Sequence, residues 1–149
     1  MAGGWLSIGT KRPSPRVWTV EADGGAPAKL LLDPGYDGWV PRWSRDGRWI
    51  YFASSRSGSA QIWRAPANGE APLQITRNGG FESRESPDGK YLYFSKRARA
   101  KGIWRIALDT PNAIEEKFAD FDSAGQSRCW DVGPAGLYIA TAGPSREGR

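Results

Sequence analysis

The segment "RWSRDGRWIYFASSR", residues 42–56, returns as "RESPDGKYLYFSKR" at residues 84–97, and this repetition decides the fold. Asp46-Gly47 recurs as Asp88-Gly89, and the apolar run after each pair recurs with it. Self-similarity at a period of about 42 residues is typical of architectures built from copies of one supersecondary unit. The phrase therefore indicates architecture and not an active-site motif used twice.

Each repeat reads as four short segments. They are "VPRWS", "RWIYFASS", "AQIWRAP" and "PLQITR" in the first unit, and "ESRES", "KYLYFSK", "GIWRIAL" and "IEEKFADF" in the second. Aromatic and β-branched residues without a 3.6-residue stripe favour strands. Asp-Gly favours a hairpin, because Gly accepts positive φ and Asp bonds the neighbouring backbone. Four antiparallel strands in about 42 residues are typical of a β-propeller blade.

The full repeats lie near residues 38–77 and 80–121, with partial blades at both ends of a single domain, 1–149. The partial units are "WLSIG", "RVWTV" and "AKLLL" before them and "SRCWDV" and "LYIATA" after them. The sequence thus predicts an all-β protein of four-stranded antiparallel blades, about three in number, forming a partial propeller. Closed propellers usually have about four to eight blades. We favour a fragment of a longer propeller. Self-association to complete a ring and an unusually small closed barrel are the alternatives.

The phrases "WSRDGRWIYFASSR…QIWR" and "ESPDGKYLYFSK…GIWR" resemble PD40 repeats, the WD40-like propeller repeats of TolB-type proteins. Similar repeats occur in the propellers of S9-family (prolyl oligopeptidase-like) hydrolases and in bacterial winged-helix regulators. The Ser-Pro-Asp-Gly core of the family is intact at residues 86–89 and has Arg in place of Pro at residues 44–47. The third copy, "DVGPAG" at residues 131–136, has lost it.

This resemblance implies a non-catalytic binding, sensing or scaffold module. The implied function stays this broad because propellers of this kind carry many unrelated functions. The alternatives are the gating propeller of an S9-family hydrolase and the sensor propeller of a winged-helix transcriptional regulator. A TolB-like role implies the periplasm and a regulator implies the cytoplasm. No signal peptide is visible at the start of the sequence, and the compartment stays open.

Composition argues against catalysis and cofactors. The chain has no His and one Cys, Cys129, so Ser-His and Cys-His pairs and Cys-rich zinc sites are excluded. No "GxSxG" elbow, phosphate-binding glycine loop or cluster of metal ligands is present. We therefore expect a protein that is not an enzyme, with no catalytic residues, no metal and no cofactor.

The charge pattern bears on partners. The net charge is +5, but basic residues are interleaved with Asp and Glu, and the only basic cluster, "KRARAK" at residues 96–101, falls where a hairpin loop is expected. We therefore expect no nucleic-acid partner. No apolar run reaches the roughly 20 residues that a membrane-spanning helix needs, so no membrane insertion is expected. The partner classes left are a protein or a small anionic ligand.

Residues that recur with the repeat have structural and functional interpretations. Trp18, Trp63 and Trp104 share one position of the third segment, and packing between blades is favoured over a stacking platform for ligands. Asp46 and Asp88 are interpreted as turn formers and not as a carboxylate pair.

Three arginines form the candidate binding site. Arg42 and Arg84 occupy equivalent positions beside the first strand, which lines the channel of a propeller, and Arg128 lies one residue from the matching position of the third unit. Converging guanidinium groups bind anions through bidentate, charge-assisted hydrogen bonds. The structural alternative is pairing with neighbours such as Glu82 and Glu85.

Overall fold

The Asp-Gly hairpins are the local basis of the fold. In the computed structural model, which describes residues 14–98, 101–121 and 129–140, Asp46 accepts hydrogen bonds from Ser44 Oγ at 2.7 Å and from the Arg48 amide at 3.0 Å. Gly47 has a φ of 70°, a backbone angle that residues other than glycine rarely adopt. Asp88 makes the same pair of bonds in the second repeat. Both aspartates are turn formers, as the sequence predicted.

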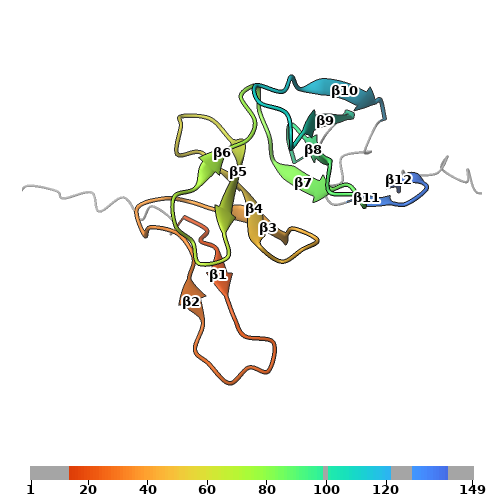
Figure 1. Ribbon diagram of the computed structural model, residues 1–149. Helices are drawn as coiled ribbons and strands as arrows, with labels where there is room; N and C mark the ends of the chain where they lie inside the picture. Colours follow the sequence, from red (N-terminus) through yellow and green to blue (C-terminus); the bar gives the residue numbers. More distant parts are fainter. Residues whose placement is uncertain (1–13, 99–100, 122–128, 141–149) are drawn as a thin grey trace, which may run out of the picture.

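Twelve strands lie in four antiparallel sheets within the described residues (Figure 1). Each of two blades has four strands in sequence order. The first blade consists of β3 (Trp39–Trp43), β4 (Trp49–Ser54), β5 (Gln61–Pro66) and β6 (Leu73–Gln74). The second blade consists of β7 (Glu82–Glu85), β8 (Tyr91–Ser95), β9 (Ile103–Ala107) and β10 (Glu116–Ala119). The expected all-β propeller fold is confirmed.

A two-stranded sheet stands on each side of these blades. The N-terminal half-blade consists of β1 (Trp18–Thr19) and β2 (Lys29–Leu30). The C-terminal half-blade consists of β11 (Trp130–Gly133) and β12 (Gly136–Ile139). In Figure 1 the β1–β2 hairpin projects below the first blade and the β11–β12 hairpin lies beside β7. The expected segment "WLSIG" lies outside the described residues.

The strand register shows which part of a blade each half represents. Trp63 of β5 pairs with Gln74, and Trp104 of β9 pairs with Lys117 of β10. Trp18 of β1 pairs with Leu30 of β2 in the same way. The N-terminal half-blade therefore consists of a third and a fourth strand. The C-terminal half-blade consists of a first and a second strand, joined by the 133–136 turn.

The apolar cores lie between blades. One core joins the N-terminal half-blade to the first blade, and its buried residues are Val17, Leu31, Leu32, Ile50, Phe52 and Ala65. The other joins the two full blades, and its buried residues are Tyr51, Ala53, Ile62, Leu92, Phe94 and Ile106. Successive residues of β4 thus point to opposite neighbours, which follows from the two-residue period of a strand.

Two of the recurrent tryptophans pack between blades, as predicted. Trp63 packs on the core between the N-terminal half-blade and the first blade. Trp104 packs on the core between the two full blades. Trp18 differs, because 53% of its surface is exposed. In the described residues no blade lies on the side of β1 that Trp18 faces.

Candidate functional site

The first strands of the sheets, β3, β7 and β11, lie next to one another and carry the predicted arginine positions. Arg42 pairs in register with Tyr51 and Arg84 with Tyr93, so the two arginines are structurally equivalent. In β11 the residue that pairs with the corresponding tyrosine, Tyr138, is Asp131. We call Arg42, Arg84 and Asp131, which take the same position on three neighbouring first strands, the inner row. Its third member is therefore an acid.

Arg84 is held by acidic and aromatic neighbours. Its guanidinium lies 2.9 Å from Glu82 Oε1 and 3.2 Å from Asp131 Oδ1, and it donates to the Ser83 carbonyl oxygen at 2.9 Å. Its Cζ lies 5.1 Å from the centre of the Trp130 ring. The side chain is 14% exposed, and that of Glu82 is 2% exposed. The predicted pairing with Glu82 is thus present.

The other two predicted arginines differ from Arg84. Arg42 is exposed on β3, and Arg128 lies outside the described residues. The convergence of the three arginines on an anion stays a prediction. Arg42 on β3 and Arg84 on β7 lie on neighbouring strands, and Asp131 lies on β11, the strand on the other side of β7.

Arg56 lies in an aromatic cage at the end of β4. Its Cζ lies 4.5 Å from the ring centre of Tyr36, 5.0 Å from that of Trp63 and 5.5 Å from that of Phe52. Its Nε donates to Ser54 Oγ at 3.2 Å. Burial lowers the pKa of Arg56 from its ordinary value, because an apolar environment disfavours the charged form. The cage fastens the loop before β3 to the first blade, so its evident role is structural.

A groove on the outer edge is the best candidate binding surface. It has a volume of about 660 Å³ and lies between β6 of the first blade and the 108–115 loop of the second. Leu73 and Ile114, on its walls, are 54% and 84% exposed. Ile75, Leu108 and Ala113 also line it and pack on the core between the blades. A concave surface with apolar and polar residues in near-equal measure is suited to holding a segment that carries both.

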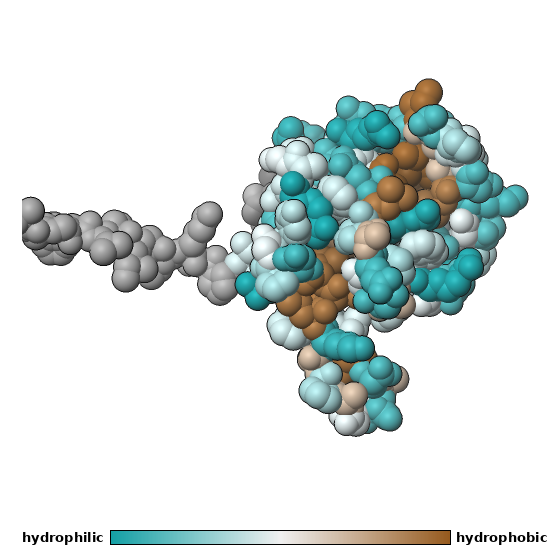
Figure 2. All heavy atoms as spheres, turned by 60° about the vertical axis from the view of Figure 1, so that its left-hand side comes forward, coloured by the Kyte–Doolittle hydropathy of each residue, from teal (hydrophilic) through white to brown (hydrophobic). Residues whose placement is uncertain are grey.

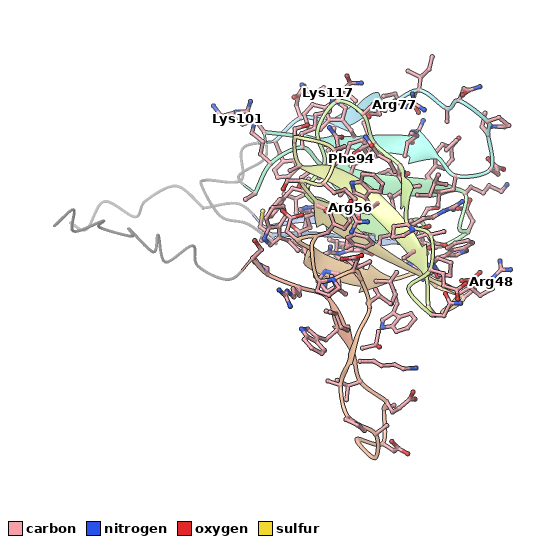
Figure 3. The ribbon with its side chains drawn as sticks, turned by 90° about the vertical axis from the view of Figure 1, so that its left-hand side faces the viewer. Arg48, Arg56, Arg77, Phe94, Lys101 and Lys117 are labelled. Atoms are coloured by element: carbon pink, nitrogen blue, oxygen red, sulfur yellow. The ribbon has the colours of Figure 1, made fainter. Side chains whose placement is uncertain are left out.

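The charged residues of the groove are mostly basic. Its one acid, Glu115, accepts hydrogen bonds from the amides of Arg77 at 2.6 Å and Asn78 at 3.1 Å, and forms an ion pair with Lys96 at 3.3 Å. Arg64 and Arg77 are the cationic lining residues. Figure 3 shows Arg77 at the same end of the molecule as Lys101 and Lys117, with Arg48 well away from it. The groove therefore carries two cationic side chains and one acid that is already paired with Lys96.

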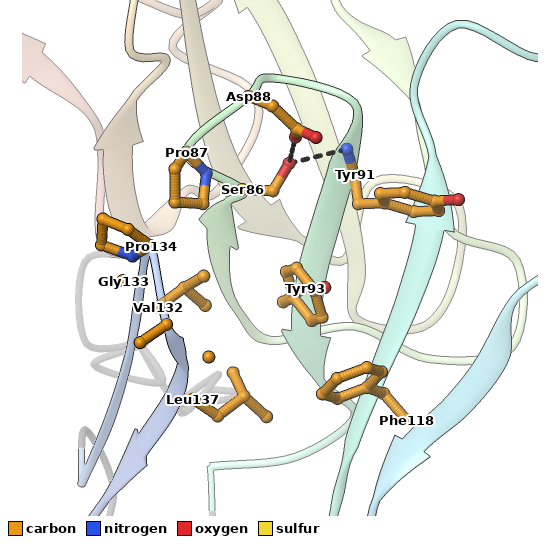
Figure 4. Close-up of a pocket in the computed structure, with 12 residues that line it drawn as sticks. Ser86, Pro87, Asp88, Tyr91, Tyr93, Phe118, Val132, Gly133, Pro134 and Leu137 are labelled. Atoms are coloured by element: carbon orange, nitrogen blue, oxygen red, sulfur yellow. Dashed lines mark hydrogen bonds between the residues drawn. The ribbon is translucent and has the colours of Figure 1, made fainter.

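A second cleft, of about 430 Å³, separates the second blade from the C-terminal half-blade (Figure 4). Tyr91, Tyr93 and Phe118 form one wall, and Val132 and Leu137 lie on the other. The rings of Tyr93 and Phe118 meet edge to face at 5.0 Å. The Ser86–Asp88 hydrogen bond, at 2.6 Å, closes one end of the cleft. The cleft occupies the position that a blade interface takes elsewhere in the chain.

Figure 2 shows two apolar areas on one face of the molecule, separated by hydrophilic surface, one of them beside the projecting hairpin. Among the residues that the structure describes, no group of three or more His, Cys, Asp or Glu is placed to hold a metal ion. The same part of the chain contains no helix long and apolar enough to cross a membrane.

The four-stranded antiparallel blades with their first strands side by side define a β-propeller fold. The chain is similar to a solved structure described as a TolB of Agrobacterium tumefaciens, with a TM-score of 0.63 and 24% identity over 83% of this chain and 49% of that one. It is also similar to TolB of Acinetobacter baumannii, with a TM-score of 0.65 and 20% identity over 88% of this chain and 33% of that one. These likenesses establish the fold.

The chain also has relatives among curated protein sequences. An uncharacterized protein of Agrobacterium fabrum is 38% identical over 81 residues, which are 52% of this chain and 27% of that protein. No family model matches the chain. The chain therefore spans about a quarter of this curated relative and half or less of the two TolB structures.

The outer groove and the second cleft were not foreseen from the sequence. The walls of the groove come from two outer segments, 73–78 and 106–115, that belong to different repeats. Aligning the repeats compares each segment only with its counterpart in the other blade, which conceals that these two segments meet across a blade boundary. Ile114 gave the one available signal, an isolated aliphatic residue beside a charged stretch, "IEEK".

Proposed function

We propose that the chain is a non-catalytic, protein-binding propeller module built from PD40-type repeats, and that its outer groove holds the partner. The observation that carries this proposal is the exposure of Leu73 and Ile114 beside a groove of about 660 Å³. Neither side chain belongs to a blade core. Large exposed aliphatic residues beside a concave surface mark sites of protein association.

The partner is a peptide segment with apolar side chains and acidic flanks. Apolar side chains would cover Leu73 and Ile114, and carboxylates would lie near Arg64 and Arg77. The net charge of +5 adds long-range attraction to an acidic partner, which speeds association more than it strengthens the final complex.

The test is selection of a random peptide display library on the immobilised full chain. We expect the selected peptides to combine apolar and acidic residues and to lose binding to Leu73→Asp and Ile114→Asp. Arg48→Ala is the control and should keep binding, because Arg48 does not line the groove and lies well away from Arg77 in Figure 3. Peptides that bind the wild type and both groove variants equally would place the binding surface elsewhere and refute the proposal.

A small anionic ligand at Arg42, Arg84 and Arg128 stays a prediction for the same module. Arg84 already lies within 3.2 Å of two carboxylate groups, so an anion must displace or add to them. The two alternatives from the repeat resemblance, an S9-family gating propeller and a regulator's sensor propeller, assign the same blades to larger proteins. No observation on the described residues favours either of them over the binding module.

A further inference from the structure

Two equivalent arginines lie on the third strands of the two full blades. Arg64 of β5 and Arg105 of β9 each pair in register with a tyrosine of the neighbouring second strand. Each guanidinium also lies over an aromatic ring. Arg64 Cζ lies 4.5 Å from the centre of the Trp49 ring, and Arg105 Cζ lies 4.6 Å from that of the Tyr91 ring. Both blades therefore hold this guanidinium by the same kind of contact.

The residue opposite each arginine on the fourth strand differs between the blades. Glu116 of β10 pairs in register with Arg105, and its carboxylate accepts a hydrogen bond from Arg105 Nε. In the first blade the residue that pairs in register with Arg64 is Leu73 of β6. An aliphatic side chain thus occupies the position where the second blade has the acid that pairs with its arginine.

Arg64 has no acidic partner in the part of the chain that the structure describes. Its Nε is buried and has no hydrogen-bond acceptor among those residues, and it forms no ion pair with them. Tyr51 lies beside it on β4, and burial raises the pKa of Tyr51 to about 12, so the phenol is neutral at pH 7. A buried donor without an acceptor costs free energy, which an incoming acid would recover.

This unsatisfied donor belongs to the outer groove. Arg64 and Leu73 both line the groove, whereas Arg105 and Glu116 do not. The acid of the groove, Glu115, is already engaged by an ion pair and by two loop amides. An acidic group that enters the groove therefore meets a cation with which no described carboxylate forms an ion pair.

Access to Arg64 depends on a side chain that can move. Because Nε itself is buried, a carboxylate reaches it only when a neighbouring group shifts. Leu73 lies directly opposite on β6 and is 54% exposed, and exposed side chains change rotamer within nanoseconds. The bond between Glu116 and Arg105 shows that a carboxylate at this position of a blade reaches the arginine Nε.

We propose that Arg64 is a carboxylate-binding site that selects an acidic side chain of the partner segment, bound as Glu116 is bound to Arg105. This inference deepens the peptide-binding role proposed for the outer groove and rests on it. The aspartate or glutamate of the segment accepts charge-assisted hydrogen bonds from the guanidinium, and a nearby aliphatic residue of the segment contacts Leu73. Arg64 and Leu73 thus require an acidic and an aliphatic side chain close together in the segment.

The first test uses propionate as the probe and the isotope-labelled full chain. Sodium propionate, compared with sodium chloride at equal ionic strength, should shift the Nε–Hε NMR resonance of Arg64 in a saturable way. That resonance is assigned by its loss in Arg64→Lys. Arg105 is the internal control and should shift less, because Glu116 already binds its Nε. Equal shifts of both arginines, or no shift of either, would overturn the proposal.

The second test supplies the carboxylate from the chain itself. Leu73→Glu places an acid opposite Arg64, as Glu116 lies opposite Arg105, and Leu73→Gln has the same size without the charge. Without any ligand, the Arg64 resonance of Leu73→Glu should move toward that of Arg105 and should no longer respond to propionate. Leu73→Gln should respond as the wild type does. The same response in both variants would contradict the proposal, because the position opposite Arg64 would then not reach its guanidinium.

The third test uses the peptides selected on the immobilised wild type. Each acidic peptide is compared with its amide counterpart, in which Asn replaces Asp or Gln replaces Glu, and the acidic form should bind about tenfold or more tightly. Arg64→Gln should abolish that preference, whereas Arg105→Gln, at the equivalent position outside the groove, should keep it. A preference that survives in Arg64→Gln would assign the acid to another cation.

The two proposals can fail separately. Peptides that lose binding to Leu73→Asp and Ile114→Asp but show no preference for acids would refute the role of Arg64 and leave the groove as the protein-binding surface. A propionate response at Arg64 in a chain that selects no peptides at the groove would refute the peptide-binding function, while the carboxylate site at Arg64 would stand.

Discussion

The guanidinium of Arg84 bridges two acids from different blades, with Glu82 at 2.9 Å and Asp131 at 3.2 Å. Glu82 is nearly fully buried, and its ion pair with Arg84 contributes to compensating its charge. This arrangement ties the inner strand of the second blade to the C-terminal half-blade. A residue that was predicted to bind a ligand therefore has a structural contribution that can be measured.

Arg84→Ala should lower the free energy of unfolding by about 3 kcal/mol, because it removes one member of a buried ion pair with Glu82. Arg42→Ala, at the equivalent but exposed position, should cost less than half as much. Urea unfolding measures both. Arg84→Met combined with Glu82→Gln should recover part of the loss, since the buried charge is then gone. Equal costs for Arg42→Ala and Arg84→Ala would argue against the buried pair.

The anionic-ligand hypothesis has its own test, a thermal-shift screen with phosphate and small carboxylates. A ligand held by Arg42, Arg84 and Arg128 should raise the Tm of the wild type. It should raise the Tm of Arg42→Ala and the Tm of Arg84→Ala by less. Each shift is referred to the Tm of the same variant without ligand, so the intrinsic cost of the substitution cancels. Equal shifts in all three proteins would end the hypothesis.

Low pH should reduce the stability of the β3–β4 hairpin, because Asp46 becomes protonated there. Hydrogen bonds from Ser44 and from the amide and side chain of Arg48 lower the pKa of Asp46 to about 2, from an ordinary value of 3.8. A depressed folded-state pKa stabilises the fold above the unfolded value, so this contribution is complete above about pH 4 and is lost as the pH falls toward 2.

Asp46→Asn removes that titration but keeps an acceptor oxygen in the turn. The free energy of unfolding of Asp46→Asn should therefore fall less between pH 5 and pH 2 than that of the wild type, as measured by urea unfolding at each pH. Parallel pH profiles for the two proteins would show that Asp46 contributes nothing to acid sensitivity.

Gly80 marks a close approach of two chain segments. A Cβ at this position would lie 2.6 Å from Thr76 Oγ1 and 2.7 Å from Ile62 Cγ1. Gly80→Ala should cost about 2 kcal/mol by overpacking, as judged by thermal or urea unfolding. Gly25→Ala is the control, because its nearest neighbour would be an exposed Asp23 oxygen at 3.3 Å, and its effect should stay within about 0.5 kcal/mol. Equal losses of stability in Gly80→Ala and Gly25→Ala would mean that Thr76 and Ile62 can move away from residue 80 at little cost.

The aromatic cage around Arg56 should stabilise the loop before β3. Arg56→Met keeps much of the apolar stem but loses the cation, and we expect a loss of about 1–2 kcal/mol in urea unfolding. Arg56→Lys should fall between the two, because an ammonium group does not stack on rings as a planar guanidinium does. A methionine variant as stable as the wild type would assign the cage to packing alone.

The strands of the complete blades were predictable because Asp-Gly turns separate runs of aromatic and β-branched residues. The outer strand β6 shows where that reasoning stops. The segment "PLQITR" contributes only Leu73–Gln74 to the ladder. Beyond it, Thr76 Oγ1 accepts the Ile62 amide hydrogen bond at 2.8 Å, so a side chain replaces the backbone partner that a longer strand would provide.

The candidate site was predictable in part. Arg42 and Arg84 were placed by their distance from intact Asp-Gly turns, and Glu82 was named as a partner. Asp131 was not, because the third copy has lost the turn sequence that would align it, and the alignment settled on Arg128 instead. The groove depends on contacts between two blades, which the repeat pattern within one blade does not encode.

Strand β4 serves two apolar cores at once, because Ile50 and Phe52 belong to one core and Tyr51 and Ala53 to the other. Each core therefore needs residues from two neighbouring blades. A single blade taken alone would lose both cores, so the smallest unit of this fold that can unfold cooperatively spans more than one blade.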